Sequence, residues 1–261
     1  MDSLWNKSSL QIYKALNGQV RLVGGCVRDY LLRRPMHDRD MTTPLPPDEI
    51  EKALQTAKIH FISIGKKFGT ITALIAGEPY EITTLRKEEK HDGRYAKMTW
   101  TTSYKTDALR RDFTINALSA DIKNKIFDYT TGRSDLAQGL VRFIGDPEKR
   151  IQEDYLRILR YFRFWSAISP LDLDTAVIQA CKRHKKGLEI LSTDRVRDEL
   201  FRLSCTPRAE EALIAMKKAE LLTHKMLGLD FSKKQVQTLK EQGKDKMLAK
   251  VGFIVFKKGE K

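Results

Sequence analysis

The sequence predicts an α+β fold, with a mixed β-sheet in a small head followed by an all-helical remainder. Up to about residue 135, short β-branched and apolar runs alternate with helical patterns between glycines and prolines. Beyond Pro147 only helical spacing recurs, with breaks at Pro170, Gly187 and Pro207. We therefore expect a head at residues 1–137, a helical domain at 138–205 and a short basic helical segment at 206–261.

The first expected elements surround a pair of glycines. A short strand at Arg21–Val23 enters Gly24-Gly25, and residues 27–32 then have helical spacing. A second strand is expected at Asp38–Thr42, where prolines follow and stop it. The next helix begins at Pro47 and runs to about residue 57, because proline suits a first turn and acidic residues suit its positive end.

The rest of the head is expected to be strands and one long loop. β-Branched residues favour strands at Ile59–Ile64, Gly69–Ile75 and Tyr80–Leu85. Residues 86–104 are charged and lack periodicity, which indicates a mobile loop of a length that is usually functional or disordered. Helical spacing resumes over Thr106–Leu118, and a hairpin turn at 123–125 precedes a last short strand at 126–129.

Helical patterns fill the second half of the chain. Pro147 starts an amphipathic helix whose apolar stripe runs from Ile151 to Phe162. Further helices are expected at Leu171–Lys182, Thr193–Leu203 and Pro207–Leu222.

Composition limits the class of protein. The 261 residues are 41% hydrophobic and 31% charged, as in soluble globular proteins, and can bury a core. No apolar run reaches the ~20 residues of a membrane span, and the N-terminus lacks the pattern of a secretory signal. The three scattered cysteines predict neither a disulfide framework nor a zinc site, so we expect a cytoplasmic protein.

The net charge of +14 indicates a polyanionic partner. The last 31 residues hold nine lysines and three acidic residues, and this segment is either a solvated face or an RNA contact. The candidate RNA-contacting residues are Lys182, Arg183, Lys185, Lys186, Lys233 and Lys234.

The glycine pair and three acidic residues predict a phosphate and metal site. Gly24 and Gly25 at a strand end let backbone N–H groups approach a phosphate, and Arg28 follows one turn into the helix as a counter-charge. Asp38 and Asp40 are two residues apart, which on a strand points both carboxylates to one face, where all-oxygen ligation suits Mg²⁺. Glu81 on a neighbouring strand is the candidate third carboxylate. The alternatives are that the two glycines form only a tight turn, that Asp38 and Asp40 belong to an ordinary D-x-D turn, and that Glu81 is an exposed strand residue.

A second cluster predicts contacts to a triphosphate and a ribose. Two adjacent arginines, Arg110 and Arg111, can hold phosphate oxygens bidentately, and Asp112 can accept from a ribose hydroxyl. Asn116 follows one turn later as a further polar contact. The alternative is a surface salt-bridge cluster.

A third cluster predicts recognition of a base. Asp154 and Arg157 are i, i+3 on the expected helix, and Arg160 lies a further turn on. A carboxylate beside a guanidinium matches the amine donor and ring-nitrogen acceptor of cytosine and adenine, and it rejects uracil and guanine. The alternative is a solvent-exposed ion pair. If the pair selects the base, addition needs no nucleic-acid template, and we expect an RNA 3′-hydroxyl to attack the α-phosphate of a nucleoside triphosphate.

These segments resemble the class II tRNA nucleotidyltransferases, which comprise CCA-adding enzymes and their poly(A) polymerase relatives. The resemblance covers about residues 15–205 and rests on G-G-x-V-R-D-x-L-L…D-x-D, F-G-T-I-T…Y-E-I-T-T-L-R, R-R-D-F-T-I-N-A, E-D-x-L-R-x-x-R and S-T-D-R-V-R-D-E-L. It implies a polymerase β-like catalytic head, a nucleotide-selecting neck and a tRNA-contacting body. It also implies that Asp38 and Asp40 hold metals, that Arg111 and Asp112 contact triphosphate and ribose, and that Asp154 and Arg157 read the base, with Arg160 positioning that pair or touching phosphate.

The activity implied by the resemblance is CCA addition to tRNA 3′ ends from CTP and ATP, with pyrophosphate release. The alternatives are an A-adding enzyme or a poly(A) polymerase and, more remotely, a non-catalytic RNA-binding protein. Residues 86–104 resemble the flexible loop that enzymes restricted to CC addition lack. The chain departs from the family at Arg33, where glycine is common, and only 56 residues follow Cys205, which is expected of a naturally compact or a truncated enzyme.

Overall fold

The chain divides into two units, the head at Met1–Ala137 and the helical unit at Gln138–Lys261. The computed structural model describes residues 3–36, 38–89, 97–223, 226, 237–239 and 241–242. Within these residues no helix is long and apolar enough to cross a membrane. The predicted α+β class is confirmed, with strands in the head and, among the described residues, helices alone in the second unit.

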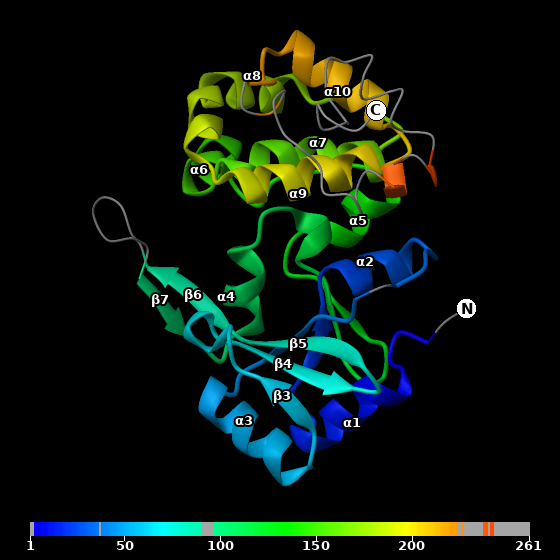
Figure 1. Ribbon diagram of the computed structural model, residues 1–261, viewed down its shortest axis with the longest axis vertical. Coiled ribbons are helices and arrows are strands. Elements are labelled where there is room, and N and C mark those ends of the chain that lie inside the picture. Colours follow the sequence, from blue (N-terminus) through cyan, green and yellow to red (C-terminus); the bar gives the residue numbers. More distant parts are fainter. Residues whose placement is uncertain are drawn as a thin grey trace, which may run out of the picture. The chain divides into compact units, whose positions relative to one another are not determined.

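Seven strands form the sheet of the head, in the order β3-β4-β5-β2-β1-β8-β9 (Figure 1). Their bounds are β1 (Arg21–Val23), β2 (Met41–Thr43), β3 (His60–Ile62), β4 (Thr70–Ile75), β5 (Glu78–Thr84), β8 (Ser119–Ala120) and β9 (Ile126–Phe127). Every pair is antiparallel except β2 and β5, which run parallel with Met41 opposite Ile82. This register places Asp40, just before β2, next to Glu81 on β5.

The expected strand at Asp38–Thr42 begins later than predicted, at Met41. The Asp40 carbonyl nevertheless accepts a hydrogen bond from the Val23 N–H at 2.9 Å, so the pairing with β1 extends one residue before β2. Asp38 therefore lies outside the regular strand, and the same-face argument from strand geometry does not hold for it.

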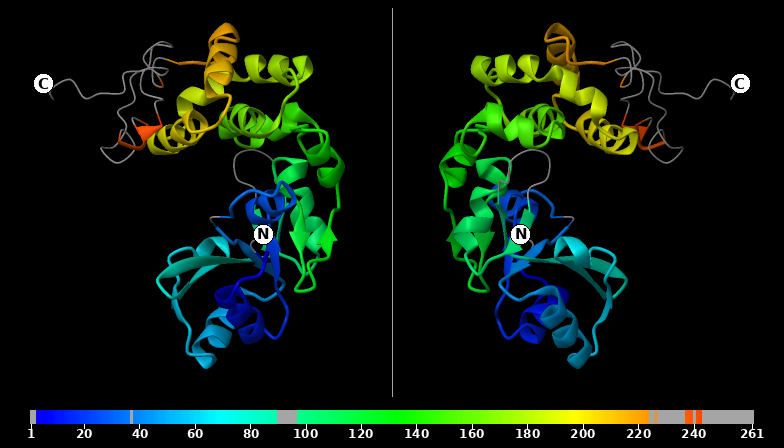
Figure 2. Two further views of the ribbon diagram at one scale, coloured as in Figure 1. Left: turned by 90° about the vertical axis from the view of Figure 1, so that its right-hand side faces the viewer. Right: turned by 90° about the vertical axis from the view of Figure 1, so that its left-hand side faces the viewer.

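Two helices cover one face of the sheet, α1 (Lys7–Ala15) and α3 (Pro47–Thr56) (Figures 1 and 2). Helix α3 packs on β3 and β4, and α1 packs on α3. The core between them contains Ile12, Ile50, Leu54, Ile71 and Ile82, all without exposed surface. On β5 the alternation of buried Tyr80 and Ile82 with exposed Glu81 turns the glutamate to the other face.

Helix α2 (Gly25–Leu31) ends in a conformation that explains the unusual Arg33. Arg33 has φ +56°, in the left-handed region that glycine occupies most easily. The Arg34 N–H donates to the Asp29 carbonyl at 2.9 Å, which gives the six-residue closure of a glycine-capped helix end. The glycine common in the family at this position therefore has a backbone reason.

We expect Arg33→Gly to stabilise the protein. A left-handed non-glycine residue costs about 1–2 kcal/mol, and Arg33 is exposed, so the substitution removes strain and little packing. Urea unfolding should show a gain of about 1 kcal/mol, whereas Arg34→Gly, next to it and outside the positive-φ set, should give none. A loss of stability in Arg33→Gly would contradict this explanation.

Residues 86–104 contain regular structure that the sequence pattern did not predict. Strands β6 (Arg86–Glu89) and β7 (Lys97–Trp100) form an antiparallel pair with Arg86 opposite Trp100. Residues 90–96 of the predicted loop lie outside the described residues. The prediction of a structureless loop is wrong for its two ends, because cross-strand pairing does not require apolar periodicity in an exposed hairpin.

The expected helix at Thr106–Leu118 is also different. Helix α4 (Tyr104–Leu109) ends early, and a 3₁₀ turn, η2 (Thr114–Asn116), follows before β8. The head is completed by η1 (Lys66–Phe68) and α5 (Gly132–Ala137). The apolar residues Phe113, Ile115 and Leu118 are fully buried, so their spacing reflects core positions rather than a continuous helix.

The helical unit contains α6 (Pro147–Glu153), α7 (Leu156–Ile168), α8 (Thr175–Arg183), η3 (Lys185–Ile190), α9 (Thr193–Ser204) and α10 (Ala209–Lys218). Helix α7 packs against α9 and α10, and α6 packs against α8 (Figure 2). The single long helix predicted from Pro147 is wrong, because Asp154 has extended backbone angles, φ −157° and ψ 106°, and separates α6 from α7.

Candidate functional site

The glycine turn of the head is shaped by its backbone and by a neighbouring arginine. Gly24 has φ +75° and precedes α2. A Cβ at this position would lie 3.5 Å from Nη1 of Arg111, and a Cβ at Gly25 would lie 3.7 Å from Nη2 of Arg28. The turn therefore places unhindered backbone beside two guanidinium groups, which is an arrangement suited to phosphate.

Three acidic residues interact at the same end of β1 and β2. Asp40 has exposed surface, yet desolvation of its carboxyl and then the charges of Glu81 and Asp38 together raise its pKa to about 6, against the opposing charge of Arg111. Glu81 and Asp38 are exposed. The structure thus places Glu81 and Asp38, the other two carboxylates that the sequence singled out, within electrostatic range of Asp40.

The donor set fits a divalent cation that a substrate helps to bind. No three His, Cys, Asp or Glu groups among the described residues form a ready-made metal cage. Mg²⁺ is commonly bound by one or two carboxylates together with substrate phosphates. The negative charges of Glu81 and Asp38 repel the ionised Asp40 carboxylate, and a bound cation would relieve this repulsion.

A hydrogen-bonded network joins α2 to η2 next to the glycine turn. Arg28 donates to both oxygens of Asp29 at 2.9 and 3.0 Å and to Oδ1 of Asn116 at 2.8 Å. Asn116 in turn donates to Oδ1 of Asp112 at 3.2 Å, and the same oxygen accepts the Phe113 N–H at 2.8 Å. Asp112 is buried, so this network fixes the positions of three predicted site residues: Arg28, Asp112 and Asn116.

Asp107 orients the arginine pair, and the sequence analysis missed it. Asp107 is 2% exposed and accepts from Nε of Arg110 at 2.8 Å and from Nη2 of Arg111 at 2.9 Å. Burial alone would raise the pKa of Asp107, but the charges and hydrogen bonds of Arg111 and Arg110 outweigh it and lower the pKa. The i, i+3 and i, i+4 spacing from Asp107 was a readable signal.

We expect Asp107→Asn to destabilise the head by about 3 kcal/mol at pH 7, since it leaves two largely buried arginines without their carboxylate. Because the folded-state pKa is depressed, this stability is present above the ordinary value of 3.8 and is lost as pH falls through the folded value. Urea unfolding of the parent and the variant, measured from pH 7 downward, should show that the difference in their free energies of unfolding decreases. Asp194→Asn, at an exposed surface pair, is the control, and a pH-independent gap would contradict the argument.

In the helical unit the predicted base-reading residues each have another partner. Oδ2 of Asp154 accepts from Arg195 on α9 at 2.8 Å, and Oδ1 accepts the Leu156 N–H at 3.1 Å. Arg157 donates to the Arg150 carbonyl and to Glu153, both at 2.7 Å. Arg195 and Glu153 therefore position the pair.

The remaining predicted residues of this unit are placed as follows. Arg160 lies 5.3 Å from the ring centroid of Phe164. Among the candidate RNA contacts, Lys182, Arg183 and Lys186 are exposed at the end of α8 and in η3. Arg183 pairs with Glu148, and Lys185 pairs with Glu220 at 2.7 Å. Lys233 and Lys234 lie outside the described residues.

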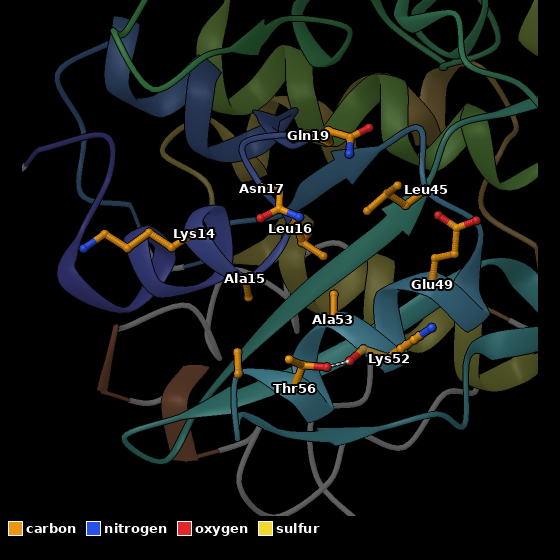
Figure 3. A pocket seen from close by; sticks show the side chains of 11 residues that line it. Lys14, Ala15, Leu16, Asn17, Gln19, Leu45, Glu49, Lys52, Ala53 and Thr56 are labelled. Atoms are coloured by element: carbon orange, nitrogen blue, oxygen red, sulfur yellow. Dashed lines mark hydrogen bonds between the residues drawn. The ribbon is translucent and has the colours of Figure 1, made fainter.

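A cavity of about 670 Å³ lies elsewhere in the head, between the end of α1 and α3 (Figure 3). Its lining includes the apolar residues Ala15, Leu16, Leu45 and Ala53 together with polar and charged side chains such as Asn17 and Glu49. None of the predicted site residues lines it, so we assign it no part in the site.

Comparison with known proteins gives two family matches. The poly A polymerase head domain matches residues 20–142, and the probable RNA and SrmB-binding site of polymerase A matches residues 170–231. The human mitochondrial CCA tRNA nucleotidyltransferase 1 is 42% identical over 200 residues, covering 76% of this chain and 46% of that protein. The CCA-adding enzyme of Staphylococcus saprophyticus is 40% identical over 200 residues, covering 76% of this chain and 49% of that protein.

A solved structure is similar as well. The Bacillus stearothermophilus CCA-adding enzyme in complex with CTP superposes with a TM-score of 0.76 at 30% identity, covering 91% of this chain and 57% of that one. The chain belongs to the class II tRNA nucleotidyltransferase and poly(A) polymerase family. It spans about half the length of the curated relatives it matches.

Proposed function

We propose that this chain catalyses template-independent addition of CMP and AMP to tRNA 3′ ends from CTP and ATP, with release of pyrophosphate. The observation that carries the proposal is the convergence of Asp40, Glu81 and Asp38 beside the glycine turn that faces Arg111. The names of the relatives support the choice of CCA as the added sequence.

The head supplies groups for the triphosphate. The backbone at Gly24 and Gly25 and the Arg111 guanidinium would bind phosphate oxygens, and Asp112 would accept from the ribose. Asp40 and Asp38, with Glu81 beside them, would hold Mg²⁺, which when bound neutralises the carboxylates and polarises the attacked phosphate. Arg28, beside the same turn, would also attract phosphate, and with Asn116 it would position Asp112.

The helical unit supplies the choice of nucleotide. Asp154 would accept from the exocyclic amine that cytosine and adenine share, and Arg157 would donate to the ring nitrogen beside it. The exposed cations at the end of α8 would contact the tRNA backbone. We also propose a cytoplasmic location.

An A-adding enzyme is the second candidate, because the family match is to a poly A polymerase head domain. Incubation with tRNA that ends at the discriminator base, given CTP and ATP separately and together, separates the candidates. We expect two added nucleotides with CTP alone and three with both. Addition from ATP alone, without prior C addition, would favour the second candidate, and no addition under any condition would contradict catalysis by this chain.

A further inference from the structure

Two exposed aromatic rings lie where β4 of the head begins. Trp100, at the end of β7, is 40% exposed, and Phe68, in η1, is 55% exposed. Gly69 joins them, because a Cβ at this residue would lie 2.6 Å from Cζ3 of Trp100. The indole therefore packs against the Gly69 backbone, and 40% of the Trp100 surface meets solvent. We call Phe68 and Trp100 the aromatic shelf.

Backbone contacts hold the shelf in place. Nη1 of Arg86 donates to the Phe68 carbonyl at 2.9 Å, and Arg86 is the cross-strand partner of Trp100. The Thr101 N–H donates to the Leu85 carbonyl at 2.9 Å. The exposure of the rings is therefore fixed by the hairpin and η1, and Gly69, with φ +82°, leaves the space that the indole needs.

The chemistry of the shelf fits single-stranded nucleic acid better than a protein surface. Nζ of Lys67 lies 4.9 Å from the Phe68 ring centroid, and Lys67 is exposed. Exposed rings flanked by cations bind unpaired nucleotides, since bases stack on the rings and the cations attract phosphates. The net charge of +14 favours the same partner.

The shelf lies within a few nucleotides of the acidic residues. Gly69 is three residues before Thr72, which pairs with Glu81 in the sheet. At ~3.3 Å per strand residue this is roughly 10 Å, or about three stacked bases at ~3.4 Å each.

We propose that the aromatic shelf stacks unpaired nucleotides next to the 3′ end of the RNA acceptor. This inference rests on the proposed function, which brings such an end to Asp40 and Glu81. It assigns Phe68 and Trp100 a part in binding RNA and none in the chemical step.

Tryptophan emission provides a direct test. Trp5 and Trp165 are buried, so an RNA that stacks on the shelf changes the emission of Trp100 alone. A hairpin RNA with a short unpaired 3′ end should quench the emission of the full chain, and the same hairpin with a blunt end should not. Trp100→Leu, which still covers Gly69, should bind the first RNA about tenfold more weakly, as expected for one lost stacked base.

Two further variants make the test selective. Trp100→Phe keeps a ring and should retain most of the affinity, while Ile64→Ser, at an exposed aliphatic residue outside the shelf, should bind like the parent. Equal binding by the parent and a Trp100→Leu protein with unchanged melting temperature would overturn the proposal. Concentration-dependent dimerisation that Trp100→Leu abolishes would also overturn it, because the shelf would then join two copies.

Nucleotide addition is measured in parallel. If the parent adds nucleotides but shows no quenching, the shelf proposal fails and the proposed function stands. If quenching occurs without addition, the proposed function fails and with it the acceptor role of the shelf, while the binding of unpaired RNA to Trp100 stands.

Discussion

We expect Asp40→Asn to lower nucleotide addition about a thousandfold or more while leaving tRNA binding nearly unchanged. The substitution removes the carboxylate that interacts with both Glu81 and Asp38, and loss of several kcal/mol of metal-dependent stabilisation corresponds to this factor. Single-turnover addition of CMP and AMP, alongside filter binding, measures both effects. Incorporation of either nucleotide at the parent rate would remove Asp40 from the site.

The same variant should be more stable than the parent in the absence of a divalent cation. The folded-state pKa of Asp40 is raised from 3.8 to about 6, so its stabilising protonated form is lost as pH rises through that value. The difference in the free energy of unfolding between Asp40→Asn and the parent should therefore grow between pH 4 and 7 and stay constant above pH 7. Two pKa units correspond to about 3 kcal/mol, which solvent exposure reduces to about 1 kcal/mol.

Added Mg²⁺ should reduce this difference in stability, because it should raise the melting temperature of the parent and not that of Asp40→Asn. Glu78→Gln, an exposed glutamate at the start of the same strand as Glu81, is the matched control and should respond to Mg²⁺ like the parent. If Mg²⁺ does not change the melting temperature of the parent, either with or without CTP, the metal site is contradicted.

The elements that local chemistry determines were predictable. Strand β1 with its glycine end, helix α3 with proline at its start, and helix α9 all lie close to the predicted ranges. Helix α1 was missed, although Asn6 and Ser9 form a capping box, because no apolar run marks the helix that follows.

The break at Asp154 could not be read from its neighbourhood. Neither glycine nor proline lies near it, and the flanking residues favour helix. It depends on distant residues instead: Arg195 pairs with Asp154, and Gly187 leaves space for the Tyr155 ring, which would lie 2.1 Å from a Cβ at that position. Such contacts appear only once the chain is folded.

The candidate site shows the same contrast between local patterns and contacts made only on folding. The acidic residues and glycines could be found because their spacing has a chemical meaning. Their positioning partners, Asp29 and Asp107, could not be found, since they resemble ordinary surface acids until burial and hydrogen bonds are known.

Asp154→Ala should change which nucleotide is added more than how fast. The substitution removes the acceptor for the amine of cytosine and adenine, and a hydrogen bond to a charged group contributes about 1.5–3 kcal/mol, so preference over UTP and GTP should fall roughly 10- to 150-fold. Single-turnover rates with each of the four nucleotides give this ratio.

The contacts of Asp154 make the test specific. Arg195→Ala frees the carboxylate without removing it, so it should alter selectivity less than Asp154→Ala. Asp194→Ala, at a neighbouring exposed carboxylate that pairs with Arg197, should alter neither rate nor selectivity. Because Asp154 also accepts the Leu156 N–H at the start of α7, its loss could act through the fold instead. In that case all four rates would fall together with the melting temperature, and the base-reading role would be wrong.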